Sequence, residues 1–212
     1  ALYFQFLASE KGFRSDSRIH LHEALSFDSS LAIIYFALGH SYFEGDPVAL
    51  GYYQRAQELA PHWLSALNWL GYTYLYSEPK KGVFYHNKAL TIDSNNCEAL
   101  IMLGWAYQAM GQPDSALLLM KRAAEALDQK YKSQPNSFTA TDCIHASQAL
   151  RELKAFEKAK DYLLLGEKIS KGKYGPIYGN LCLVYTDLMD FENAVKACNT
   201  LFEVNGLKKR DW

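Results

Sequence analysis

Pairs of small residues spaced seven apart recur along this chain at an almost constant interval, and this feature constrains the fold more than any other. The pairs are Ala49 and Ala56, Gly82 and Ala89, Ala116 and Ala123, and Ala159 and Gly166. The interval is 33 residues from Ala56 to Ala89 and 34 residues from Ala89 to Ala123. A repeat of this length with helical spacing inside it predicts an array of stacked helix pairs, each burying its apolar side against its neighbours. Such an array favours binding over catalysis.

The clearest single unit of this pattern runs over residues 97–128. Its first half has the i, i+3, i+4, i+7 spacing of an amphipathic helix, at Leu100, Leu103, Gly104 and Tyr107. Gly111 is expected to end that helix, and Pro113 lies where the first turn of a second helix needs no N–H donor. The apolar stripe of the second helix is Ala116, Met120 and Ala123. Two antiparallel helices can approach closely at the Gly and Ala positions, because these residues lack bulk.

These units resemble the tetratricopeptide repeat family, whose helix pairs carry a leading aromatic residue, Leu-Gly, Tyr, and then Ala, an aromatic residue, Ala and a closing Pro. The residues that match in three close copies are Tyr35, Leu38, Gly39, Tyr42, Ala49, Tyr53, Ala56 and Pro61; Leu67, Leu70, Gly71, Tyr74, Gly82 and Ala89; and Leu100, Leu103, Gly104, Tyr107, Ala116 and Ala123. Two weaker copies follow, and the last has Leu201 where the family has a small residue. The resemblance implies an all-α, right-handed superhelical solenoid. The start of the chain is also loosely similar to repeat regions attached to bacterial transcription regulators, cyclases and Ser/Thr kinases.

We expect a single solenoid domain over residues 1–212. The resemblance divides it into a partial leading repeat, three well-matched repeats, a longer connection and two divergent repeats, over residues 1–31; 32–63, 64–96 and 97–128; 129–139; and 140–173 and 174–207. The chain opens part-way through a repeat, which suggests a piece of a larger protein. Its segment Leu2-Tyr3-Phe4-Gln5 either belongs to a first helix or is the remnant of a protease-cleavage linker, and the sequence leaves both open.

Charge and residue spacing argue against several classes of protein. The 22 basic and 23 acidic residues are mixed along the chain, so no phosphate-tracking surface and no nucleic-acid partner is expected. No apolar run is long enough to insert into a membrane. The cysteines show no CxxC spacing and have no histidine at ligand spacing, so we expect neither a metal nor another cofactor. No nucleophile triad, phosphate loop or carboxylate pair stands out, and we expect no enzyme.

The four cysteines are Cys97, Cys143, Cys182 and Cys198. We expect them to be free thiols that act as small buried hydrophobic side chains. Cys182 and Cys198 fall at packing positions of the last helix pair, so the two can also be neighbours. Free thiols are compatible with a reducing compartment, and we favour a cytoplasmic location.

The candidate partner-binding residues follow from the resemblance, because in this family the first helix of each pair lines a concave groove. They are Phe36, His40, Phe43, Asn68, Tyr72, Tyr76, Glu98, Ile101, Trp105 and Gln108. Aromatic side chains in such a groove would anchor apolar side chains of a partner. The alternative is that several of them belong to the core between repeats, and for Phe36 the two interpretations are equally supported.

The sequence therefore predicts a protein–protein interaction module that binds a peptide or a partner helix, as a regulatory or sensory part of a larger protein. The alternative is a scaffold or assembly subunit that self-associates through its repeat ends. In that case the interface would include residues near the end of the chain, namely Leu201, Phe202, Val204 and Leu207.

Overall fold

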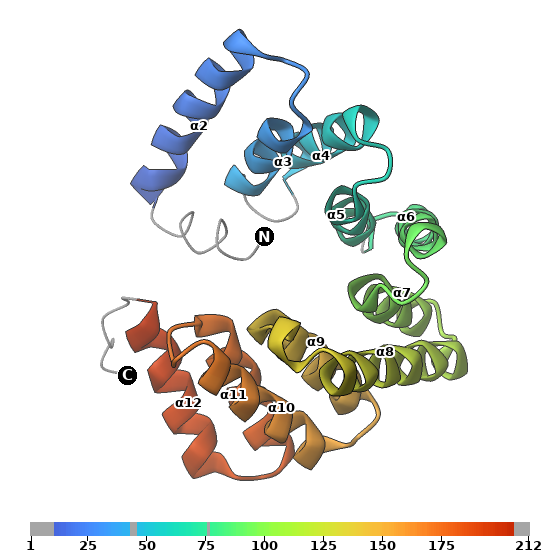
Figure 1. The fold of residues 1–212 in the computed structure, drawn as a ribbon, viewed down its shortest axis with the longest axis vertical. Helices are drawn as coiled ribbons and strands as arrows, with labels where there is room; N and C mark the ends of the chain where they lie inside the picture. Colours follow the sequence, from blue (N-terminus) through green and yellow to red (C-terminus); the bar gives the residue numbers. More distant parts are fainter. Residues whose placement is uncertain (1–10, 43–45, 76, 206–212) are drawn as a thin grey trace. The chain divides into compact units, whose positions relative to one another are not determined.

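Figure 1 shows the fold in a computed structural model, which describes residues 11–42, 46–75 and 77–205. These residues form eleven α-helices and one short 3₁₀ helix, and none of them lies in a β-strand. The predicted fold class, an all-α superhelical repeat, is confirmed. No helix in these ranges is both long and apolar enough to cross a membrane. The same ranges contain no group of three or more His, Cys, Asp or Glu side chains that could hold a metal ion.

The chain divides into two compact units, Ala1–Ser94 (unit 1) and Asn95–Trp212 (unit 2). The described helices of unit 1 are α2 (Lys11–Phe27), α3 (Ala32–Ser41), α4 (Pro47–Leu59), α5 (Leu64–Tyr74) and α6 (Pro79–Ile92). Those of unit 2 are α7 (Cys97–Ala109), α8 (Pro113–Ser133), the 3₁₀ helix η1 (Pro135–Ser137), α9 (Ala140–Glu152), α10 (Phe156–Ile169), α11 (Gly175–Asp187) and α12 (Phe191–Val204). Five hairpins result, because α3 packs on α4, α5 on α6, α7 on α8, α9 on α10 and α11 on α12.

Local chemistry explains where these helices begin and end. Proline occupies the first turn of α4, α6 and α8, where a missing N–H costs nothing. The first helices of the hairpins in unit 2 end at a residue with left-handed backbone, namely Gly111, Lys154 and Met189 with φ of 73°, 57° and 58°. In each case the next N–H bonds back to a carbonyl of the last turn, which closes the helix. The predicted roles of Gly111 and Pro113 are both confirmed.

Each of the three well-matched hairpins brings a small residue of its first helix under a large side chain of its second helix. A Cβ atom placed on Gly39 would lie 2.5 Å from the Tyr53 ring, and one on Gly104 would lie 2.5 Å from Met120 Cε. One on Gly71 would collide with the ring of His86. The sequence prediction that helices approach closely at the small residues is confirmed.

The connection expected over residues 129–139 begins as helix. Helix α8 continues through Ser133, and η1 fills most of the remainder. The extra turns of α8 are held by aromatic contacts, with the Tyr131 ring 5.1 Å from Phe138 and 6.2 Å from Tyr162 between centroids. Because Phe138 is buried in the core of unit 2, the longer connection expected here is packed structure.

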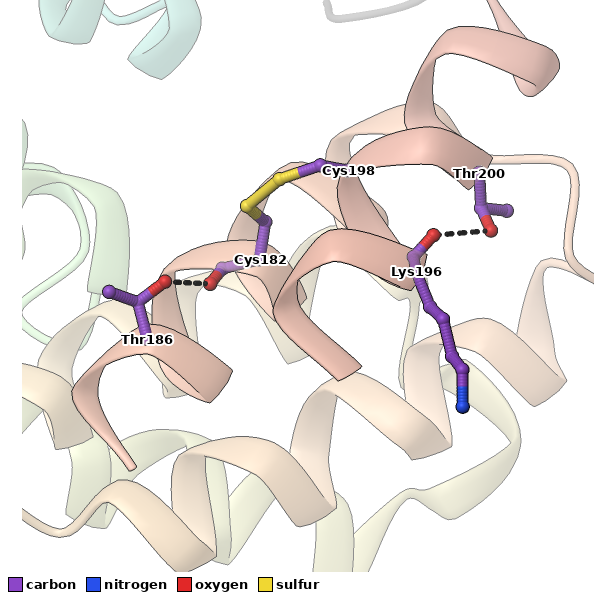
Figure 2. Close-up of a disulfide and its surroundings, with 5 residues drawn as sticks. All are labelled: Cys182, Thr186, Lys196, Cys198 and Thr200. Carbon is purple, nitrogen blue, oxygen red and sulfur yellow. Dashed lines mark hydrogen bonds between the residues drawn. A yellow bond between two sulfur atoms is a disulfide. The ribbon is translucent and has the colours of Figure 1, made fainter. Parts of the chain in front are cut away.

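A disulfide joins Cys182 of α11 to Cys198 of α12, so the expectation that all four cysteines are free thiols is wrong for this pair (Figure 2). The two Cα atoms are 5.4 Å apart, which is within the usual range for a disulfide. The hairpin brings the cysteines together because each occupies a packing position of its helix. Cys97 and Cys143 are free, and Cys143 is buried as expected, with burial raising the pKa of its thiol to about 12.

Candidate partner-binding face

Three first helices of successive hairpins, α7, α9 and α11, pack next to one another in unit 2. The small packing residues of these helices are Gly104, Ser147 and Cys182, and the residues directly after them are Trp105, Gln148 and Leu183. Trp105 and Gln148 are partly buried, and Leu183 is exposed. We call the surface formed by these three residues, together with Glu98, Gln108, Arg151, Glu152 and Asp187, the first-helix face of unit 2.

A hydrogen bond crosses this face between α7 and α9. The indole Nε1–H of Trp105 donates to a carboxylate oxygen of Glu152 at 3.0 Å. A bond to an ionised acceptor is stronger than one between neutral groups, so it holds the indole ring in one orientation. The ring keeps part of its surface open to solvent while its polar edge is already satisfied.

An ion pair crosses the same face between α9 and α11. Arg151 Nε donates to a carboxylate oxygen of Asp187 at 2.6 Å, and the two side chains are 26% and 27% exposed. Partial burial reduces the screening by water that weakens most surface ion pairs. The three first helices are therefore linked in a row by side-chain contacts, one between each neighbouring pair.

Charged groups also approach each other near the start of α7. Burial lowers the pKa of His145 on α9, and the carboxylates of Glu98 and Asp142 partly oppose this shift. Asp142 itself accepts hydrogen bonds from Lys130 and from Thr139. Burial alone would raise the pKa of Asp142, but these partners hold it below its usual value. Glu98 is partly buried and Gln108 is exposed, so both side chains reach solvent.

The predicted candidates of unit 1 have a different environment, because Phe36, His40 and Asn68 are all buried. The Phe36 ring lies 4.4 Å from His40 and 4.5 Å from Trp63 between centroids. For Phe36 the structure therefore favours the core interpretation. Helix α3 is apolar on nearly every side, so neighbouring helices cover more than one of its faces.

His40 lies at the centre of this aromatic cluster. Its Nδ1 is 3.0 Å from the Phe36 carbonyl oxygen and 3.1 Å from the Tyr53 hydroxyl, and burial lowers its pKa to about 4. The imidazole is therefore neutral at pH 7 and acts as a packing residue. Tyr72 is partly exposed beside the cluster, with its ring 5.5 Å from that of Trp69.

The remaining candidates divide between core and undescribed residues. Ile101 is fully buried in unit 2 and reaches no solvent. Phe43 and Tyr76 lie outside the described residues, as do Leu207 and the segment Leu2 to Gln5. Of the eight candidates that the structure describes, Tyr72, Glu98, Trp105 and Gln108 therefore have surface that a partner can reach.

Sequence reasoning did not single out Glu152, Arg151 and Asp187. A usable signal was present, because Glu152 and Asp187 each follow the small packing residue of their helix by five positions. The candidates all lie in the three well-matched repeats, whereas these three residues lie in the two divergent ones. The offset of Gln108 from Gly104 leads to Arg151 on α9, whereas Glu152 and Asp187 share the offset that Tyr76 has from Gly71.

Comparison with known proteins supports the repeat architecture. A family model described as tetratricopeptide repeat matches residues 86–118. The crystal structure of the APC/C hetero-tetramer Cut9–Hcn1 is similar with a TM-score of 0.59 and 16% identity, over 92% of this chain and 38% of that chain. This chain thus spans less than half the length of that relative.

Two further structures are similar at lower scores. The protein PilF of Pseudomonas aeruginosa has a TM-score of 0.49 and 16% identity, over 92% of this chain and 85% of its own. YrrB, described as a tetratricopeptide repeat protein with an unusual peptide-binding site, has a TM-score of 0.43 and 20% identity, over 87% and 91% of the two chains. No curated protein matches this sequence.

Proposed function

We propose that this chain, a tetratricopeptide repeat protein, binds a peptide segment or helix of another protein on the first-helix face of unit 2. Tetratricopeptide repeats have the fold of a protein–protein interaction module. In this proposal the chain is a regulatory or sensory part of a larger protein and has no catalytic role of its own. Its partner is a polypeptide, with no cofactor and no nucleic acid involved.

The observation that carries the proposal is the state of Trp105. Its indole N–H is bonded to Glu152, and its ring remains partly exposed on a surface made of three packed helices. Tryptophan is the residue type most enriched among those that dominate binding energy at interfaces. Because its orientation is fixed before a partner arrives, less conformational entropy is lost on binding.

The charges of this face indicate the chemistry of the partner. The face as defined carries three carboxylates, Glu98, Glu152 and Asp187, against one guanidinium, Arg151. Such an excess favours a partner segment that combines an apolar side chain with nearby Lys or Arg. Binding should then weaken as the salt concentration rises, because salt screens the attraction between surface charges.

A second candidate function is self-association through the last helix. Phe191 and Val195 lie one turn apart on α12 and are 64% and 60% exposed, and Phe202 is also exposed on this helix. The end of a repeat array usually presents a polar outer face. These residues therefore support the scaffold alternative, whereas Leu201 and Val204 are partly buried against the core of unit 2.

Site-specific photo-crosslinking tests the two functions together. A photoreactive residue replaces Gln108 on the first-helix face, and in a matched control it replaces Lys121, which is exposed on the second helix α8. We expect crosslinks to another polypeptide from position 108, few from position 121, and loss of the former with Trp105→Ala. Crosslinks to a second copy from a probe at Val195, with none to other proteins from position 108, would instead favour the scaffold function. Equal labelling at positions 108 and 121 would contradict the proposed face.

A further inference from the structure

Helix α12 is attached to its hairpin differently from the second helices of the other four hairpins. In each of those second helices, the residue four positions after the first small residue has a large buried side chain. The small residues are Ala49, Gly82, Ala116 and Ala159, and the large side chains are Tyr53, His86, Met120 and Leu163. In α12 the same position is Cys198, and the only buried residues are Ala194 and Ala197. On α11, Cys182 occupies the position of the small residue that faces this side chain in the other hairpins. The last hairpin therefore has a covalent bond where the others have side-chain packing (Figure 2).

The position of α12 in unit 2 leaves it with little other support. Helix α8 packs on both α7 and α9, and α10 packs on both α9 and α11. Among the described helices, α12 packs substantially on α11 alone. Its side chains Phe191 and Val195 are exposed, so no described helix covers them.

We propose that the Cys182–Cys198 disulfide is a redox-controlled staple, which fixes α12 on α11 when oxidised and releases α12 when reduced. Both cysteines are partly exposed, so a dithiol reductant can reach the bond. Reduction adds two electrons and two protons to the disulfide and yields two thiols, while the dithiol becomes a disulfide itself. Two thiols cannot replace the large buried side chain that holds the other second helices. Helix α12 is then held by Ala194 and Ala197 together with the partly buried Leu201 and Val204.

The staple also bears on where this state of the protein can exist. Structural disulfides persist in oxidising environments and are rare where thiol systems keep cysteines reduced. In a reducing compartment α12 would therefore be loosened, and in an oxidising one it would be fixed. This inference is independent of the proposed partner-binding function, since it concerns the attachment of one helix.

Hydrogen exchange measured by mass spectrometry on the whole chain tests the proposal. The protein is prepared without reductant and compared with the same protein treated with dithiothreitol, a dithiol. The bond closes a loop with a sequence separation of 16, so we expect its reduction to speed exchange of the α12 amides by roughly a hundredfold. Exchange in α7, α8, α9 and α10 should not change.

Two variants separate the staple from general effects of the reductant. Cys97→Ser removes a free cysteine and should keep the full response. In the double variant Cys182→Ser with Cys198→Ser, the α12 amides should exchange as fast as in the reduced protein, and dithiothreitol should not change this rate. Equal α12 exchange with and without reductant, or four alkylatable thiols in the untreated protein, would overturn the proposal. Faster exchange across all of unit 2 would overturn it as well, because the bond would then hold more than α12.

Discussion

The imidazole ring of His86 fills the space over Gly71, so that even one methyl group at position 71 would collide with it. His86 is fully buried, so neighbouring groups surround its ring. We expect Gly71→Ala to destabilise the protein by about 1–3 kcal/mol, the usual cost of overpacking, even though alanine is the better helix former. The free energy of unfolding in urea, followed by circular dichroism, measures this change.

Gly51 supplies the matched control for that substitution. It also lies inside a helix, α4, but a Cβ atom there would meet nothing within 4 Å. Gly51→Ala should therefore stabilise the protein by about 0.5–1 kcal/mol through helix propensity alone. If both variants changed stability in the same direction, the close approach of α5 and α6 would not be the cause.

The buried histidine His86 should make unit 1 sensitive to acid. Burial lowers its pKa from 6.5 to about 4, and in the part of the chain described here neither ring nitrogen has a hydrogen-bond partner. Between these two pH values the unfolded chain binds a proton that the folded chain does not. The stability is therefore complete above pH 6.5 and declines as the pH falls toward 4, by about 3 kcal/mol for this group.

Urea unfolding at a series of pH values from 7 to 4 measures this decline. His86→Met copies the residue at the matching position of α8, Met120, and removes the titrating group. This variant should lose stability less steeply with falling pH than the parent, with the remaining slope due to other groups such as His40. A parent and a variant with the same slope would show that His86 does not titrate in this range.

The Arg151–Asp187 pair should contribute measurably to the packing of α9 against α11. Its distance of 2.6 Å and its partial burial favour a coupling energy of about 1 kcal/mol. A double-mutant cycle with Arg151→Ala and Asp187→Ala measures this coupling in urea unfolding. The exposed pair Glu192–Lys196 on α12 is the reference, and its coupling energy should be the smaller of the two because water and salt screen it. Equal coupling energies for the two ion pairs would contradict this prediction.

A packing substitution should replace the disulfide of the last hairpin. The neighbouring hairpin has Ser147 and Leu163 at the positions that correspond to Cys182 and Cys198. The variant Cys182→Ser with Cys198→Leu should therefore hold α12 without a covalent bond and be insensitive to reductant. Its unfolding midpoint with and without dithiothreitol provides the measurement, and the Ser/Ser variant should be the less stable of the two. No difference between the two variants would mean that position 198 does not pack against α11.

The helix boundaries illustrate what could be predicted well from the sequence. Gly111 and Pro113 were expected to end one helix and begin the next, and both do so. These effects are local, since a backbone that favours positive φ or lacks an N–H acts within a few residues. The segment after Asp128 was predicted less well, because Tyr131 is kept in α8 by contacts with Phe138, just beyond η1, and with Tyr162 of α10, which is distant along the chain.

The candidate face shows the same division at the level of single side chains. Phe36 and Trp105 were both candidates for the groove, yet one is buried among aromatic rings and the other is bonded to Glu152 at the surface. The pattern assigns a residue to a helix face, but the side chains of neighbouring helices decide whether that face is covered.

The amino-acid sequence by itself determined that this protein consists of repeated helix hairpins and where their helices approach closely, because both depend on spacing along the chain. The tertiary structure alone decided which first-helix residues remain accessible, how Arg151 meets Asp187, and that Cys182 is bonded to Cys198. These features join residues 16 or more positions apart. Their formation depends on the distance and orientation of whole helices, which residue spacing does not specify.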